Sequence, residues 1–261
     1  MSLERYLQRV KRDIGFSHNF LTVVAMISMF LDHAALTLIK NGKLYGFDAD
    51  LYNNAVMLDD AKFWIVLYNA MRIIGRLSFP IFAFLIVEGF RKTSNLFKYF
   101  LRLLLLAFIS EIPYDLMVFN EFFTVRCFAI QNVVFTYTIG LLMLTCMRLM
   151  SGFPSFLTVF VAALAAFLTK MLRTDYAIEG IILIYIFYIF RFDLNIKCIF
   201  ALIVTFLMSI EHYYGTAIFS VFFIYFYDGK KGYVDIGRIA YIFYPLHMLL
   251  LYGVLFFTYW K

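Results

Sequence analysis

A histidine and an aspartate occur together inside a stretch of sequence that is otherwise free of charge. His33 follows Asp32 within the apolar run 20–39. An imidazole exchanges protons near neutral pH and can act as a general base. The alternative is an interior histidine whose hydrogen bonds are all satisfied. We favour a chemical role for His33.

Two arginines lie in the next apolar run. Arg72 and Arg76 are four residues apart, so they share one face of a helix. Guanidinium groups inside a membrane helix can stabilise negative charge that develops during a reaction. They can equally form a structural ion pair with Asp32 or Glu111. Both interpretations stay open at this stage.

Further polar residues fall at the ends of later apolar runs, at what should be one level of the molecule. Charges this deep are expensive unless they face a cavity or a partner. We therefore expect one outward-facing cavity, although several of these groups could be solvated interface residues instead. The residues are Glu111, Asp115, Gln131, Asn132 and Asp175.

A second histidine, His247, lies in the last apolar run, two residues after Pro245. Proline removes a backbone hydrogen bond and kinks a helix. His247 is equally compatible with a substrate-facing position and with an ordinary interior position.

Basic residues gather at the opposite ends of the same runs. Glu88 precedes Arg91 by three residues, which suggests either a local ion pair or the lining of a cleft. The cations could bind a phosphorylated ligand, or could serve only as the positive residues that set membrane orientation. They are Arg91, Lys92, Arg102, Arg148, Lys230, Lys231 and Arg238.

The elements that must position these groups are transmembrane helices. Of 261 residues, 64% are hydrophobic and only 15% are charged, whereas a soluble domain averages about 25% charged residues. We predict an all-α polytopic bundle of about nine helices, with eight to ten as the range. The runs are 20–39, 70–90, 96–118, 128–149, 156–171, 176–190, 196–210, 213–227 and 238–259.

The distribution of Lys and Arg predicts a cytoplasmic N-terminus, because more of them fall on that side of the membrane. We treat residues 1–261 as a single transmembrane domain. Residues 1–19 should form a cytoplasmic amphipathic segment, and residues 40–69 an extracytoplasmic loop. The net charge of +6 is topogenic and does not indicate nucleic acid. Three cysteines without CxxC spacing indicate neither a metal site nor a disulfide framework.

Several stretches together resemble the TraX family of integral membrane proteins, which is named for a conjugative-pilus protein linked to pilin N-acetylation. They follow the family's order and cover most of the chain, with GRLSFPIFAFLIVEG inside the second as the most specific. Ala177 stands where the family more often has Gly. The stretches are VVAMISMFLDH (23–33), MRIIGRLSFPIFAFLIVEGFRKT (71–93), YFLRLLLLAFISEIPYDL (99–116), QNVVFT (131–136), DYAIEG (175–180), YDGKKG (227–232) and FYPLHMLLLY (243–252).

The family is distantly similar to a wider superfamily of multi-pass acyltransferases with a histidine near the outer end of an early helix. The resemblance implies a bacterial cytoplasmic-membrane enzyme, and no metal is expected. It would move an acyl group, most simply acetyl, from cytoplasmic acyl-coenzyme A to an amine or hydroxyl beyond the membrane. The acceptor would be a pilin-like peptide terminus, a glycan or an envelope polymer, and membrane lipids would surround the chain.

Within this hypothesis His33 is the base. Because Asp32 is about 100° round the helix from His33, Glu111 is the carboxylate expected to orient the imidazole. Arg76 would stabilise the oxyanion, with Asn132 as a further donor. The assigned groups are catalytic His33, Glu111, Arg76 and Asp32; acceptor-binding Arg72, Asp115, Gln131, Asn132, Asp175 and His247; and coenzyme-binding Glu88, Arg91, Lys92, Lys230 and Arg238.

Two other functions remain open. The intramembrane charges could form the ion relay of a transporter or lipid flippase, although no internal repeat is visible. The chain could also be a non-catalytic membrane component of a conjugation or secretion assembly.

Overall fold

The computed structural model describes residues 15–150, 152, 154–232 and 236–259. Its regular elements over these residues are helices, joined by short turns and two isolated bridges. The all-α prediction is therefore confirmed. Most of the predicted amphipathic segment 1–19 lies outside the described residues.

The helices follow the predicted runs closely in most places. Their bounds are α2 His18–Ala34, the π-helix η1 Ala35–Lys43, α3 Ala49–Val56, α4 Ala61–Gly75, α5 Ser78–Lys92, α6 Leu96–Phe119, the 3-10 turn η2 Val125–Phe128, α7 Val133–Leu149, α8 Phe156–Met171, α9 Ala177–Ile189, α10 Leu194–Leu207, α11 Ile210–Tyr213, η3 Thr216–Ile218, α12 Phe219–Tyr225 and α13 Gly237–Tyr259.

Polar side chains cap the N-termini of several of these helices. The first backbone N–H groups of a helix have no partner within it, so a preceding Ser, Asn or Asp accepts from them. Ser17 caps α2 through the Phe20 N–H at 3.2 Å, and Asn95 caps α6 through the Lys98 N–H at 2.9 Å. Asn132 and Asp193 cap α7 and α10 in the same way.

Within the described residues, three helical segments are long and apolar enough to cross a membrane. They cover residues 18–43, 61–92 and 237–259, with 26, 32 and 23 residues. A span needs about 20 residues. The helices α8, α9 and α10 have 16, 13 and 14 residues, so the predicted count of nine spans stays a prediction.

Residues 40–69 do not form the predicted loop. The π-helix η1 continues α2 to Lys43, and α4 begins at Ala61. Buried Ile39 and Leu44 pack with Trp64 and neighbouring apolar side chains of α4. This packing makes the polar-looking segment helical, because its apolar residues find partners on the preceding helix.

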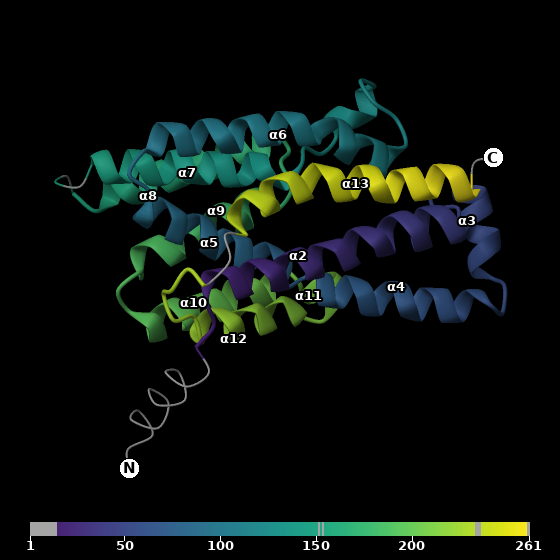
Figure 1. Cartoon of the computed structure of the whole chain (residues 1–261), viewed down its shortest axis with the longest axis horizontal. Coiled ribbons are helices and arrows are strands. Elements are labelled where there is room, and N and C mark those ends of the chain that lie inside the picture. Colours follow the sequence, from purple (N-terminus) through teal and green to yellow (C-terminus); the bar gives the residue numbers. More distant parts are fainter. Residues whose placement is uncertain (1–14, 151, 153, 233–235, 260–261) are drawn as a thin grey trace, which may run out of the picture.

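Helix α5 is the centre of the bundle. It packs against α2, α7, α9 and α12, while α13 packs against α2 and α6. Phe84, Val87 and Phe90 of α5 are fully buried. Figure 1 shows α2, α4 and α13 running side by side along the long axis of the molecule.

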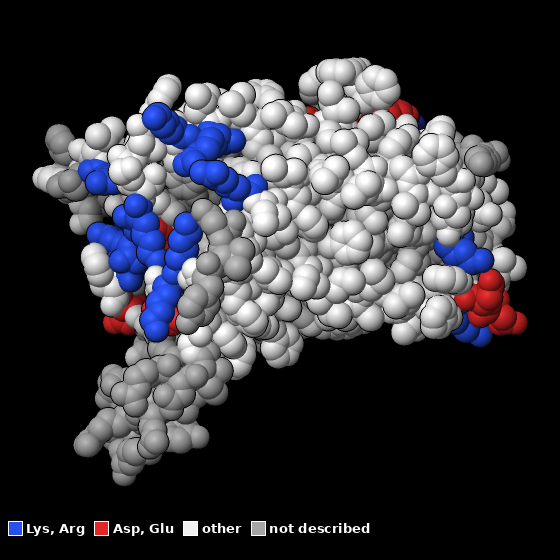
Figure 2. All heavy atoms as spheres, in the orientation of Figure 1, with Lys and Arg blue, Asp and Glu red and all other residues white. Residues whose placement is uncertain are grey.

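In the view of Figure 2 most charge lies towards the two ends of the molecule, with some acidic atoms at the upper edge and a broad uncharged band between the ends. Lys and Arg gather at one end, which we call the basic end. Exposed Arg91, Lys92, Arg102, Arg148 and Arg238 belong to it. The band carries exposed Phe and Leu side chains that water would disfavour and lipid accepts.

Candidate active site

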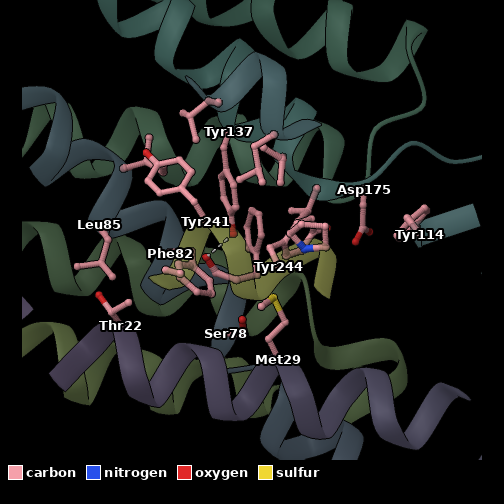
Figure 3. A pocket seen from close by; sticks show the side chains of 18 of the residues that line it. Thr22, Met29, Ser78, Phe82, Leu85, Tyr114, Tyr137, Asp175, Tyr241 and Tyr244 are labelled. Atoms are coloured by element: carbon pink, nitrogen blue, oxygen red, sulfur yellow. Dashed lines mark hydrogen bonds between the residues drawn. The ribbon is translucent and has the colours of Figure 1, made fainter. Parts of the chain in front are cut away.

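A cavity of about 1280 Å³ runs through the bundle from the basic end to the predicted polar layer. His18, Thr93 and Arg102 line it at the basic end, while Asp32 and His33 line its deep part. Figure 3 shows Phe82, Tyr137 and Tyr244 around the same space, with Asp175 and Tyr114 further along. A cavity is therefore present, but it reaches the basic end instead of facing only outward. Of the polar residues predicted at the helix ends, Asp175 lines it, whereas Glu111, Asp115, Gln131 and Asn132 do not.

Asp32 joins the two arginines. Its Oδ2 accepts from Arg72 Nη1 at 2.6 Å, and its Oδ1 accepts from Arg76 Nη2 at 2.5 Å. The side chains of all three residues are only 13–16% exposed. Burying three charges is tolerable only because they are paired. The two arginines of this cluster exceed Asp32 by one positive charge, and the carboxyl of Asp175 lies close enough to interact with both of them.

Gly75 allows the carboxylate to reach both guanidinium groups. A Cβ at this position would lie 2.5 Å from the Asp32 Cβ, closer than packed atoms come. Gly75 ends α4, one residue before the turn that separates α4 from α5. The helix break therefore places Arg76 at the cavity wall with Asp32 packed against the backbone.

Each arginine of this cluster also donates a hydrogen bond to a tyrosine hydroxyl. Arg76 Nη1 donates to the Tyr176 hydroxyl at 2.8 Å, and Arg72 Nε donates to the Tyr213 hydroxyl at 3.0 Å. The Tyr213 ring also lies 4.6 Å from the Arg76 guanidinium, a cation–π contact. An arginine has five N–H donors, of which three on Arg76 are engaged by described residues. The remaining donors suit a substrate oxygen.

A strained turn brings Asp175 and Tyr176 to the cavity. Tyr176 has φ 54°, a left-handed conformation that costs a non-glycine residue free energy. The Thr136 hydroxyl donates to the Asp175 carbonyl at 2.5 Å, and the Asp175 N–H donates to the Gln131 carbonyl at 2.9 Å. The Tyr176 ring stacks on Phe79 at 4.0 Å. Gln131 therefore supports the site through its backbone.

His33 pairs with His247 across the bundle. The His33 Nδ1 and the His247 Nε2 are 2.7 Å apart, and the rings are nearly parallel at 6°. His247 is 2% exposed, and its ring stacks on Phe243 of the same helix. Asp32 turns to the arginines and His33 to α13, as expected for residues about 100° apart. The change from α2 to the π-helix η1 comes two residues after His33.

The hydrogen bonds around the two rings define their tautomers. The His247 Nδ1 lies 2.7 Å from the Phe243 carbonyl, which can only accept, so this nitrogen carries a proton. In a neutral imidazole the His247 Nε2 is then an acceptor, and His33 Nδ1–H donates to it. The Nε2 of His33 is left with its lone pair, and His33 lines the cavity. In this arrangement the His33 Nε2 can accept a proton, and His247 fixes the orientation of the His33 ring.

Glu111 does not orient His33 in the structure. Its Oε2 accepts from the Asn132 side chain and, at 3.3 Å, from the Asn132 backbone N–H. Asn132 also caps α7 and donates to the Ala107 carbonyl at 2.9 Å. The prediction failed because Asn132 offers Glu111 local donors where α6 meets α7. Asp115, one turn further along α6, is buried, whereas Glu111 is half-buried.

The predicted coenzyme-binding residues divide into two groups. Arg91 and Lys92 are held by Glu88, at 2.7 and 3.5 Å, and Lys92 also donates to the Tyr227 hydroxyl at 2.9 Å. Of the two roles predicted for Glu88, the structure shows the local ion pair, with Arg91 and with Lys92.

The other basic residues differ in their relation to the cavity. Arg238 and Arg102 both line the cavity. The sequence analysis named Arg102 among the basic residues but did not assign it to coenzyme binding. The Lys230 N–H donates to the Asp228 carboxylate, and its carbonyl accepts from the His18 N–H, both at 2.8 Å. Arg102 and Arg238 are therefore the arginines placed to meet a ligand entering at the basic end.

Sequence reasoning also missed three residues that shape the site: Gly75, Tyr176 and Tyr213. Tyr176 directly follows Asp175 within the DYAIEG stretch, which could have pointed to it. Nothing in the spacing links Tyr213 to Arg72, because 141 residues separate them. Among the described residues, no group of His, Cys, Asp and Glu is arranged to hold a metal ion.

Comparison with known proteins agrees with the family resemblance. A family model described as TraX protein matches residues 17–255. The chain belongs to the TraX family. It is also 29% identical over 263 residues to a "Probable fimbrial assembly protein FimC, serogroup H1" of Dichelobacter nodosus, which covers 93% of this chain and 97% of that protein. No solved structure matches the chain.

Proposed function

We propose that this TraX-family protein is a membrane acyltransferase that uses acyl-coenzyme A, most simply acetyl-coenzyme A. The observation that carries the proposal is the pairing of His33 with His247 on the wall of a cavity that also exposes Arg76. The pairing leaves a basic nitrogen towards substrate, and Arg76 supplies free donors nearby. A base and an oxyanion donor are what acyl transfer requires.

The basic end would be cytoplasmic by the positive-inside rule and would receive the donor. Arg102 and Arg238 line the cavity there and suit the phosphates of coenzyme A. His18 and His33 are fifteen residues apart, which is about 22 Å along a helix. An extended pantetheine arm is of comparable length, so the thioester would reach His33.

In the proposed reaction His33 is the base and Arg76 is the oxyanion donor. The His33 Nε2 takes the proton of the acceptor amine or hydroxyl as that atom attacks the thioester carbonyl. Arg76 stabilises the negative oxygen of the tetrahedral intermediate. The carbon–sulfur bond then breaks, and the thiolate of coenzyme A leaves and takes the proton from His33. Asp32 keeps Arg76 in place, and His247 holds the His33 ring.

The acceptor would be a pilin-like peptide, a glycan or an envelope polymer. The Dichelobacter relative is named as a probable fimbrial assembly protein, which supports an acceptor belonging to the fimbrial system. The cavity volume exceeds the roughly 300–1,000 Å³ typical of a pocket for one small ligand, so a second substrate has room.

The test is release of coenzyme A from acetyl-coenzyme A by purified protein in vesicles supplied with bacterial envelope extract. We expect turnover by the natural chain, and a loss of about 10²–10⁴-fold in His33→Ala, the usual contribution of a general base. His247→Ala should lower kcat while leaving the KM for acetyl-coenzyme A nearly unchanged, since His247 acts through His33. Full activity in His33→Ala would reject the mechanism.

A transporter or flippase remains the second candidate because charges lie deep in the bundle. Calorimetry with acetyl-coenzyme A separates the two functions, since only the acyltransferase should bind it. A non-catalytic assembly component would show neither binding nor a thermal shift, and would tolerate neutral substitutions at Asp32 and Arg76.

A further inference from the structure

The cavity is walled on one side by residues that also face the outer surface of the bundle. These residues lie on α6 and on the first half of α13. In Figure 1 that half of α13 bends away from α6. We call this region the lateral opening, and its five residues both line the cavity and are exposed: Leu105, Ile109, Ile242, Leu246 and Leu249.

The lateral opening is short and lies in the uncharged band. On α6 it extends seven residues from Arg102 at the basic end to Ile109, about 10 Å of helix rise, and on α13 eleven residues from Arg238 to Leu249, about 16 Å. This is about one third to one half of a hydrocarbon core of about 30 Å. Beyond it α6 and α13 stay together, and the Tyr252 hydroxyl donates to Asn120 Oδ1 at 2.9 Å.

The end of the molecule opposite the basic end is covered. The Asn41 side chain donates to the Met117 carbonyl at 3.2 Å, which ties η1 to α6. Gly42 lies against Tyr259 and Leu255 of α13. A water-soluble acceptor arriving at this end would meet these contacts before reaching His33.

A lipid chain fits the lateral opening better than the other occupants. Its walls are apolar, and each buried methylene contributes about 0.8 kcal/mol. A spanning protein helix is 10–12 Å wide and about 30 Å long, so it would have to separate α6 and α13 along their joined halves. A soluble glycan or peptide gains little from five aliphatic side chains.

We propose that the acceptor is carried on a membrane lipid, whose hydrocarbon chain enters through the lateral opening while its hydroxyl or amine reaches His33. The inference rests on the proposed acyl transfer for the identity of the reaction. Entry of a lipid chain can be measured without any turnover, so the two ideas can fail separately.

Lipid entry is tested with a fluorescent reporter inside the cavity. The natural tryptophans Trp64 and Trp260 are replaced by Phe, and Phe82→Trp or Met29→Trp provides the reporter, since both positions line the cavity. The full chain is placed in vesicles of phosphatidylethanolamine and phosphatidylglycerol with bromine on the acyl chains. Bromine quenches tryptophan only on close approach, so quenching reports chains that enter the cavity.

Two reference positions calibrate the signal. Phe108→Trp, on the surface of α6 at 62% exposure, gives full contact with lipid. Phe187→Trp, in the core at 1% exposure, gives none. We expect a cavity reporter at Phe82 or Met29 to be quenched nearly as strongly as the surface reference.

A blocking pair and a matched control locate the route. Leu105→Phe with Leu246→Phe narrows the lateral opening and should return quenching to the level of the core reference. Leu101→Phe with Leu250→Phe adds the same bulk at exposed positions of the same helices and should change nothing. Lipid entry is rejected if both cavity reporters stay at the core level, or if the blocking pair has no effect.

The identity of the acceptor is tested with radiolabelled acetyl-coenzyme A and vesicles of bacterial membrane lipid. Label that extracts with the lipids supports the proposal. Label found only in a protein band, or only in water-soluble product, overturns it. If no acceptor is labelled while the reporters are still quenched, the proposed acyl transfer fails and only lipid entry stands.

Discussion

Replacing Asp32 with Asn removes one charge from the buried cluster but keeps its shape. Asp32 accepts from Arg72 at 2.6 Å and from Arg76 at 2.5 Å, and its side chain is 13% exposed. Asn offers only one acceptor oxygen and no charge. Asp32→Asn therefore leaves two buried guanidinium groups close together without the carboxylate to which both of them donate.

The magnitude follows from these contacts. A hydrogen bond to a charged group contributes about 1.5–3 kcal/mol, so two give about 3–6 kcal/mol. Removal of one partner from a buried ion pair costs about 3–5 kcal/mol, in agreement. Arg72→Gln is the comparison variant, because it leaves the bond between Asp32 and Arg76 intact. Arg72→Gln should lower the free energy of unfolding by about half as much as Asp32→Asn.

Unfolding in mixed micelles, followed as the denaturing detergent fraction rises, gives the free energy of unfolding for each variant. Acetyl-coenzyme A turnover measured on the fraction still folded gives the effect on chemistry. We expect both to fall in Asp32→Asn. A variant that is within about 1 kcal/mol of the natural chain and fully active would show that the cluster is neither structural nor catalytic.

Three further variants test the site. Gly75→Ala should destabilise the protein by about 1–3 kcal/mol through overpacking against Asp32, measured in the same titration, and equal stability would refute the close contact. Arg102→Gln with Arg238→Gln should weaken acetyl-coenzyme A binding in calorimetry about tenfold or more, most strongly at low salt, and unchanged affinity would remove the donor path. Tyr176→Phe should lower kcat by about 2–10-fold with little change in KM, because it frees the Arg76 guanidinium from one of its restraints; a change in KM alone would assign the phenol to substrate binding.

Much of the fold could be predicted from the sequence because helices that contact lipid are made of long runs of apolar residues. Helix α6 begins and ends within a residue of the predicted run 96–118. The failure at residues 40–69 has a physical cause. Trp64 and its neighbours on α4 pack against Ile39 and Leu44, a contact that local hydropathy does not record.

The site could be predicted only in part. Helical spacing correctly placed Arg72 and Arg76 on one face and turned Asp32 away from His33. It could not show that His247, 214 residues later, completes the imidazole pair, because that depends on how α13 packs on α2. The same limit led to the assignment of Glu111 as the orienting residue, since carboxylates are the commoner partners of a histidine.

The central claim is that the cavity delivers an acyl thioester from the basic end to His33. A density map of the protein in lipid nanodiscs with a non-hydrolysable acetyl-coenzyme A analogue tests it most directly. The account predicts nucleotide density beside Arg102 and Arg238, and the acyl carbonyl within hydrogen-bonding distance of Arg76. Analogue density at the opposite end of the bundle, or a cavity empty at saturating analogue, would contradict it.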